Sequence, residues 1–147
     1  MGHNNDFSML TRISKEFHWE MGHRLPFHQG GCQNIHGHSY RAVFEVAGEL
    51  NSQGMVMDFR EVSEILKPLI KELDHIFLAD ESDTDTISFL KEKGMAHMVV
   101  PFFTTAENIA HFLMDKAVPL LPSTISEASL TIYETRTSTA RVDWRRA

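Results

Sequence analysis

Two long segments near the start of the chain alternate between apolar and polar residues, a pattern typical of β-strands. Every second position from 17 to 23 and from 36 to 46 is apolar, aromatic or histidine. In a strand, residues of one parity lie on one face of the sheet. Residues 26–34, between the two segments, are rich in glycine and polar side chains and predict a loop. The pattern therefore predicts two strands that share an apolar face.

Two helices are predicted where apolar residues recur three and four positions apart. The first opens at Asp58, and Pro68 is expected to kink or split it. The second follows Thr104, which forms a capping box with Glu107.

Shorter segments complete the pattern. Residues 98–103 are an apolar run of strand length, and 129–136 and 139–144 predict two further strands. A short helix is expected over 87–93, after an acidic loop at 80–85. The order is strand, strand, helix, helix, strand, strand, with a short extra strand before the second helix. This order predicts an α+β fold, in which an antiparallel sheet has two helices packed on one face.

Length and charge limit the class of protein. A chain of 147 residues fits one domain over 1–147, with residues 1–7 polar and expected to be flexible. A net charge of −6 and a pI near 5.8 argue against nucleic acid as a partner, although a local cationic site can still bind an anionic small molecule. No apolar run reaches membrane-spanning length, and the first ten residues lack a secretory layout. We therefore expect a cytoplasmic protein with no membrane partner.

Three histidines in this pattern can reach one metal ion. His36 and His38 are two apart on a predicted strand and so project to the same side, while Gly37 allows close approach of the backbone. His23 continues the apolar face of the neighbouring strand. Three histidines with an open fourth position are typical of catalytic zinc. The other histidines are expected to be ordinary surface or partly buried residues: His3, His18, His28, His97 and His111.

Cys32 is the only cysteine, so the chain cannot form an internal disulfide. Three roles are open for it. As a fourth ligand it would close the site as Cys–His3, leaving no open position. As a neighbour of the metal it would act as a base, because a nearby cation favours the thiolate. An inert buried cysteine is common in proteins, but the polar loop around Cys32 makes that role less favoured.

Six short segments spread over most of the chain form a specific combination. They are H-R-L-P at 23–26, C-Q-N-I-H-G-H-S-Y at 32–40, G-M-V-M-D-F at 54–59, L-D-H at 73–75, T-A-E-N-I-A at 105–110 and Y-E-T at 133–135. Together they resemble the 6-pyruvoyl-tetrahydropterin synthase / 6-carboxy-tetrahydropterin synthase family. The resemblance implies the tunnelling fold, with two strands, two helices and two strands per subunit. It also implies a homohexamer with active sites at subunit interfaces.

The family acts on 7,8-dihydroneopterin triphosphate with the help of zinc. One branch releases acetaldehyde and triphosphate and forms 6-carboxy-5,6,7,8-tetrahydropterin, an intermediate towards queuosine. The other branch eliminates triphosphate and forms 6-pyruvoyl-tetrahydropterin. The overall pattern is closer to the 6-carboxy branch, which we expect, with the 6-pyruvoyl branch as the alternative. A non-catalytic binding protein that keeps a zinc site is an alternative of another class.

The resemblance implies roles for particular residues. His23, His36 and His38 become the zinc ligands, and Cys32 becomes the proton acceptor. Asp74 and His75 become a second acid–base pair, since histidine titrates near neutral pH. As an alternative, L-D-H is only the polar end of the first helix.

The remaining implied roles concern the pterin ring. Glu134 lies on the inward parity of a predicted strand and would bind the pterin N–H groups or take part in the proton relay. Its alternative partner is Arg136 or Arg141. Thr105 and Glu107 would lie near the pterin site of a neighbouring subunit, or serve only as helix-capping residues. These two sets of alternatives stay open at the level of sequence.

The chain departs from the family pattern at three places. Met21 and Gly22 stand where small residues such as alanine usually precede the ligand histidine, and Thr104 replaces a proline. The stretch 80–103 is longer than in the shortest members. None of these positions is a proposed catalytic residue, so the departures concern the local backbone and the rim of the pocket.

Overall fold

A hairpin of two 13-residue strands forms the centre of the computed structural model, which describes residues 9–147. Strands β1 (Thr11–His23) and β2 (His36–Gly48) pair antiparallel over their whole length, from Thr11↔Gly48 to His23↔His36. The alternation predicted from sequence continues through both strands in their burial. The prediction that residues 1–7 are flexible lies outside the described residues.

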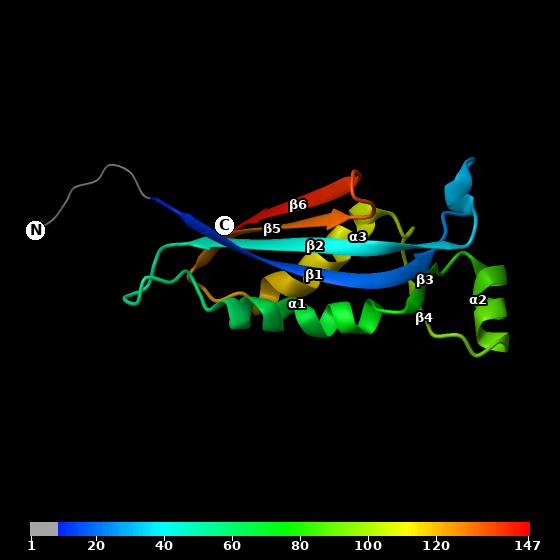
Figure 1. The fold of residues 1–147 in the computed structure, drawn as a ribbon, viewed down its shortest axis with the longest axis horizontal. Helices are drawn as coiled ribbons and strands as arrows, with labels where there is room; N and C mark the ends of the chain where they lie inside the picture. Colours follow the sequence, from blue (N-terminus) through cyan, green and yellow to red (C-terminus); the bar gives the residue numbers. More distant parts are fainter. Residues whose placement is uncertain (1–8) are drawn as a thin grey trace, which may run out of the picture.

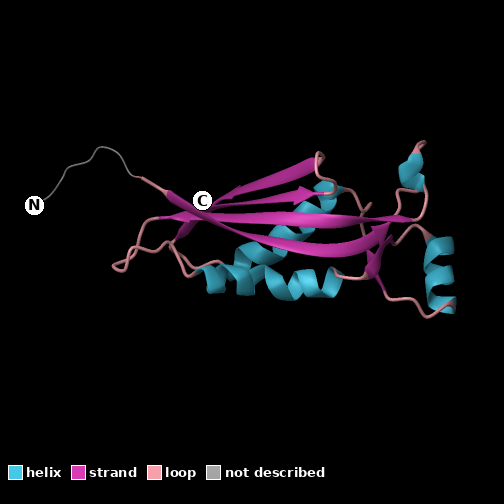
Figure 2. Ribbon diagram, in the orientation of Figure 1, coloured by secondary structure: helices cyan, strands magenta, loops and turns pink. Residues whose placement is uncertain are grey.

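Four more strands extend the hairpin into a six-stranded sheet of order β4-β3-β1-β2-β5-β6 (Figure 2). Strand β5 (Ile125–Tyr133) pairs antiparallel with β2, and β6 (Thr139–Arg145) pairs antiparallel with β5. Strand β3 (Ile76–Asp80) runs parallel to β1, and β4 (His97–Val100) runs parallel to β3. The α+β prediction is confirmed, but the sheet is mixed and not wholly antiparallel.

Strand β3 is the element that sequence patterns missed. Four of its five residues are buried, so it shows a continuous apolar run and no alternation. Such a short run after a helix cannot be told from the end of that helix by periodicity. Its two register pairs with β1, Met21↔Ile76 and Gly22↔Phe77, form only in the folded chain.

Helices α1 (Phe59–Leu73) and α3 (Ala106–Ala117) pack on one face of the sheet, as predicted (Figure 1). We call this the covered face and the opposite one the open face. A third helix, α2 (Thr84–Glu92), lies beyond the ends of β3 and β4 and begins inside the predicted acidic loop. Two 3-10 turns, η1 (Gly31–Gln33) and η2 (Val118–Leu120), complete the elements. Among residues 9–147, no helix is both long and apolar enough to cross a membrane.

Helix α1 begins as predicted and passes through its proline. The carboxylate of Asp58 accepts a hydrogen bond from the Arg60 N–H at 2.7 Å, which caps the first turn. Pro68 lies inside the helix, which is not split there. Leu66 and Ile70, on either side of it, are buried in the core. This packing offsets the backbone hydrogen bond that proline removes.

Candidate metal centre and acid–base residues

The three histidines lie together on the covered face at one end of the hairpin. His23 pairs with His36 across the strands, and His38 lies opposite Met21. Cross-strand partners project to the same face, so all three rings point the same way as buried Tyr40. The ring centroid of His23 lies 4.6 Å from that of His36 and 5.1 Å from that of His38. Strand parity therefore predicted this cluster correctly.

Backbone carbonyls set the tautomers of two of these rings. A carbonyl oxygen can only accept, so the Nδ1–H of His23 donates to the Thr104 carbonyl at 2.8 Å. In the same way, the Nδ1–H of His36 donates to the Asn34 carbonyl at 2.7 Å. Each neutral ring then presents a bare Nε2 lone pair. This is the outer-shell arrangement that commonly orients a metal-binding histidine.

The free Nε2 atoms converge on one point. His36 Nε2 and His38 Nε2 are 3.1 Å apart. His23 Nε2 is buried and makes no hydrogen bond, although Glu134 Oε1 lies 3.2 Å away. A buried lone pair without a partner destabilises the folded protein unless a cation occupies the space beside it. The donor set therefore fits a metal ion.

Glu134 completes the group from the end of β5. Its Oε1 lies 3.0 Å from His38 Nε2, and its ligand atom and those of the three histidines all lie within 4.8 Å of one another. The close approach of His23 Nε2, 3.2 Å from Glu134 Oε1, and the charge of the nearby histidines hold the pKa of this carboxyl below its ordinary value. Burial lowers the pKa of His38. The partner of Glu134 is thus the histidine cluster, whereas Arg141 pairs with Asp143.

Cys32 lies in the loop that leads into β2. It is half-buried within the η1 turn and carries a free thiol. Its backbone carbonyl accepts a hydrogen bond from the Leu25 N–H at 2.7 Å, which closes the loop. Cys32 is not among the four residues whose ligand atoms converge. The fourth group within reach of the histidines is Glu134, so the arrangement is not a closed Cys–His3 site.

Asp74 and His75 form a pair at the junction of α1 and β3. Asp74 Oδ1 accepts from the Glu20 N–H at 2.9 Å and lies 2.8 Å from His75 Nδ1. These bonds, the one from Glu20 first, hold the pKa of the Asp74 carboxyl below its usual value. His75 has a left-handed backbone, with φ of 62°, and its N–H donates to the Glu20 carbonyl at 2.6 Å. Both side chains are exposed.

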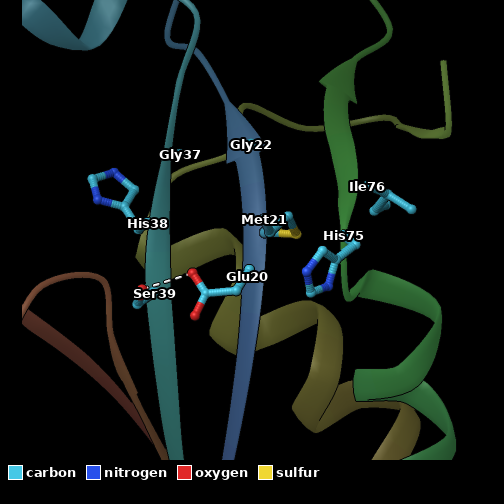
Figure 3. A pocket seen from close by; sticks show the side chains of 8 residues that line it. All are labelled: Glu20, Met21, Gly22, Gly37, His38, Ser39, His75 and Ile76. Carbon is cyan, nitrogen blue, oxygen red and sulfur yellow. Dashed lines mark hydrogen bonds between the residues drawn. The ribbon is translucent and has the colours of Figure 1, made fainter.

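His75 of this pair borders the open side of the sheet, where His38 of the histidine cluster also lines the surface. A pocket of about 360 Å³ lies there, and the facing pair Gly22 and Gly37 leaves part of its floor without side chains. His75 lines one side and Ser39, which donates to Glu20 at 2.6 Å, lines the other. Figure 3 views this pocket with the helices behind the strands. Within one chain, His75 therefore borders the open face, whereas the Nε2 atoms of the three histidines converge on the covered face of the same hairpin.

Thr105 caps α3, which confirms the alternative that it serves as a capping residue, and the capping box predicted at Thr104 is wrong. Thr105, not Thr104, accepts the hydrogen bond from the Asn108 N–H, at 3.1 Å. Thr104 is fully buried, with its hydroxyl 3.2 Å from His23 Nδ1 in addition to the carbonyl contact. Glu107 is exposed in the first turn of α3. In the sequence, the feature that set Thr104 apart was its replacement of a proline of the family pattern, and that feature did not by itself predict the contact with His23.

Comparisons with known proteins identify the family to which the chain is similar. Residues 12–144 match the family model described as 6-pyruvoyl tetrahydropterin synthase. The chain is 37% identical to 6-carboxy-5,6,7,8-tetrahydropterin synthase of Haemophilus influenzae, over 88% of this chain and 96% of the relative. It is 35% identical to the protein of the same name from Aquifex aeolicus, over 90% of this chain and 97% of the relative.

Solved structures share the fold at lower identity. The 6-pyruvoyl tetrahydropterin synthase of Plasmodium vivax superposes with a TM-score of 0.78 and 17% identity, covering 95% of this chain and 100% of that one. The Plasmodium falciparum protein of the same name gives a TM-score of 0.76 with the same coverage. At this identity the likeness shows the fold alone, and in this chain β3, α2 and β4 lie between the two helices of the predicted strand–strand–helix–helix–strand–strand order.

Proposed function

The chain belongs to the 6-pyruvoyl tetrahydropterin synthase family, and we propose that within it the protein is a zinc-dependent 6-carboxy-5,6,7,8-tetrahydropterin synthase. It converts 7,8-dihydroneopterin triphosphate to 6-carboxy-5,6,7,8-tetrahydropterin, with release of acetaldehyde and triphosphate, for queuosine biosynthesis. The observation that carries the proposal is the convergence of three histidine Nε2 atoms, one of them buried without a hydrogen bond. The names of the relatives support the choice of branch.

In this proposal His23, His36 and His38 hold zinc at the end of the hairpin. Bound zinc would polarise the side-chain hydroxyls of the substrate and make the neighbouring C–H bonds more acidic. The thiolate of Cys32, in the loop that leads into His36, accepts the proton from carbon. The loop carrying it is closed by the hydrogen bond from Leu25, so the base is held at a defined place.

Asp74 and His75 move the second proton. Nδ1 of His75 lies against the Asp74 carboxylate, which leaves Nε2 available for a proton of the substrate. An ionised Asp74 orients the ring, because its carboxylate accepts a hydrogen bond from the imidazole Nδ1–H. The lowered pKa of Asp74 supports this role, since the carboxylate stays charged at neutral pH.

A complete site needs two copies of the chain. The Nε2 atoms of the metal ligands converge on the covered face, whereas His75 borders the pocket on the open face. Within one chain the sheet lies between these two groups, which favours a substrate site that takes one group from each of two copies. We therefore propose that the active site lies between subunits, in a homohexamer.

The pterin ring would be bound by carboxylates at the same interface. A carboxylate pairs bidentately with adjacent N–H groups, which suits the amino and ring N–H of a pterin. Glu134, beside the metal ligands, would bind the ring or serve as a relay for protons. Thr105 and Glu107, at the exposed start of α3, would contribute from a neighbouring subunit.

A product assay tests the proposal. The zinc-loaded protein is incubated with 7,8-dihydroneopterin triphosphate. The molecular mass of the pterin product is determined by mass spectrometry, and acetaldehyde is measured in the same sample. We expect a 6-carboxy product with one acetaldehyde per turnover. A 6-pyruvoyl product without acetaldehyde would instead assign the protein to 6-pyruvoyl-tetrahydropterin synthase. No turnover by zinc-loaded protein would leave a non-catalytic zinc-binding protein.

A further inference from the structure

Arg24 directly follows the proposed metal ligand His23 and connects two segments that are far apart in sequence. Its Nε–H donates to the Gln33 carbonyl at 2.7 Å. Its Nη1 donates to both carboxylate oxygens of Asp83, each at 3.1 Å. About a quarter of the arginine side chain is exposed (24%) and only 7% of the aspartate side chain. The guanidinium therefore bridges the Cys32 loop and the start of α2.

The loop end of this bridge lies beside Cys32. The carbonyl of Cys32 accepts from the Leu25 N–H at 2.7 Å, and the next carbonyl, that of Gln33, accepts from Arg24 at the same distance. The carbonyl groups of Cys32 and Gln33 are thus both held by the two residues that directly follow β1, Arg24 and Leu25. Without the bond from Arg24, the bond from Leu25 would be the one hydrogen bond that joins residues 24–25 to residues 32–33 in the described part of the chain.

The other end of the bridge is itself built into the fold. Asp80, the last residue of β3, accepts from the Ser82 N–H at 2.9 Å and the Ser82 hydroxyl at 2.7 Å, which turns the chain towards α2. The Asp83 N–H donates to the Asp80 carbonyl at 2.9 Å, so this turn fixes the carboxylate that Arg24 contacts. The hydroxyl of Thr86 also lies near the guanidinium, at 3.5 Å.

We propose that Arg24, anchored by Asp83, is a positioning residue that fixes the Cys32 loop beside the metal centre. The proposal rests on the proposed function, in which Cys32 is the base. A guanidinium suits this task because its planar fork donates in two directions at once. A lysine ammonium on a flexible stem can reach the carbonyl or the carboxylate, but it lacks the fixed fork that holds both.

The contact is suited to a role in catalysis more than to a role in overall stability. Helix α2 packs through a small cluster of its own, formed by Phe77, Ala79 and Leu90, separate from the main core. Loosening the Arg24–Asp83 contact would therefore release the loop without opening the core under α1 and α3. A shift of the base of about 1 Å can lower a rate by on the order of 10²-fold.

The test compares Arg24→Lys and Asp83→Asn with a matched control, Arg146→Lys. Arg146 also donates to backbone carbonyls, from Nε to Ile125 at 2.9 Å and from Nη2 to Pro122 at 3.0 Å, but it lies near the end of β6, away from the loop. Each zinc-loaded variant is assayed for kcat, KM, zinc content and amide hydrogen exchange over residues 25–34.

For Arg24→Lys and Asp83→Asn we expect faster exchange in residues 25–34 and a fall in kcat of on the order of tenfold or more. We expect unchanged zinc content and a KM within about twofold of the parent, while Arg146→Lys leaves kcat and loop exchange unchanged. Unchanged loop exchange, or faster exchange with an unchanged kcat, would overturn the proposal. So would a loss of zinc, since Arg24 would then support the metal and not Cys32.

The exchange measurement needs no substrate and separates this proposal from the proposed function. If the parent protein fails to turn over dihydroneopterin triphosphate, the proposed function falls. Loop exchange that accelerates in Arg24→Lys and not in Arg146→Lys would still support the bridge as the element that holds Cys32.

Discussion

The two faces of the β1–β2 hairpin carry different chemistry built in different ways. On the covered face, buried His23 and partly buried His36 and His38 converge, and burial lowers the pKa of His38. On the open face, Asp74 and His75 are exposed, and hydrogen bonds lower the pKa of the aspartate. One face thus presents converging, partly desolvated imidazole nitrogens, and the other holds a solvated carboxylate–imidazole pair.

The hairpin therefore separates the three histidines from the acid–base residue His75, two groups that the proposed reaction must combine. Neighbouring side chains on a strand point to opposite faces, so the Glu20 side chain accepts from Ser39 on the open face while Met21 points to the side of the metal ligands. A second copy of the chain can bring its open-face pair to the metal face of the first.

Removing a metal ligand should abolish the function of the covered face. We expect His36→Ala to lose most bound zinc and to lower kcat by about 10³-fold or more, because a bound metal contributes several kcal/mol of transition-state stabilisation. Metal analysis and the acetaldehyde assay measure both effects. His18→Ala, an exposed histidine on the open face of β1, is the control and should keep its zinc. Undiminished zinc in His36→Ala would refute the ligand assignment.

Removing the proposed base should lower kcat without changing the zinc content. We expect Cys32→Ala to keep its zinc and to lose kcat by roughly 10²–10⁴-fold, the usual contribution of a general base. The same protein sample is used for metal analysis and for the rate. Joint loss of zinc and thermal stability would mark Cys32 as a structural ligand. A rate equal to that of the parent would contradict its role as the base.

Sequence alone predicted the covered face well because strand parity is a local property. The alternation over 17–23 and 36–46 was enough to bring the three histidines to one side. The face reached by His75 depends on its left-handed backbone and on pairing of β3 with β1, neither of which leaves a pattern in the sequence. The contact of Glu134 with the histidines depends likewise on where β5 ends against β2.

Mixing two inactive variants tests whether the faces combine between copies. His36→Ala lacks a metal ligand, and His75→Asn lacks the acid–base ring but keeps a residue that tolerates the left-handed backbone. When the two chains are unfolded and refolded together, about a quarter of the interfacial sites should hold both intact faces, if subunits assemble at random. We therefore expect activity to return to a fraction of the parent value. Each variant refolded alone is the control, and a mixture as inactive as these would contradict a shared site.

The carboxylate of the open face should make stability depend weakly on pH. The pKa of Asp74 is lowered in the folded protein, so its ionised form stabilises the fold above the pKa of the unfolded chain, and this contribution is lost as pH falls through the folded pKa. We expect metal-free Asp74→Asn to unfold at a lower temperature than metal-free parent at pH 7, by a small margin because the group is exposed. The margin should shrink towards zero at acidic pH. Asp115→Asn, which removes an exposed carboxylate of α3, is the control and should change the unfolding temperature less and without this pH trend. A difference in unfolding temperature for Asp74→Asn that stays constant down to acidic pH would contradict the hydrogen bonds to Asp74 as its cause.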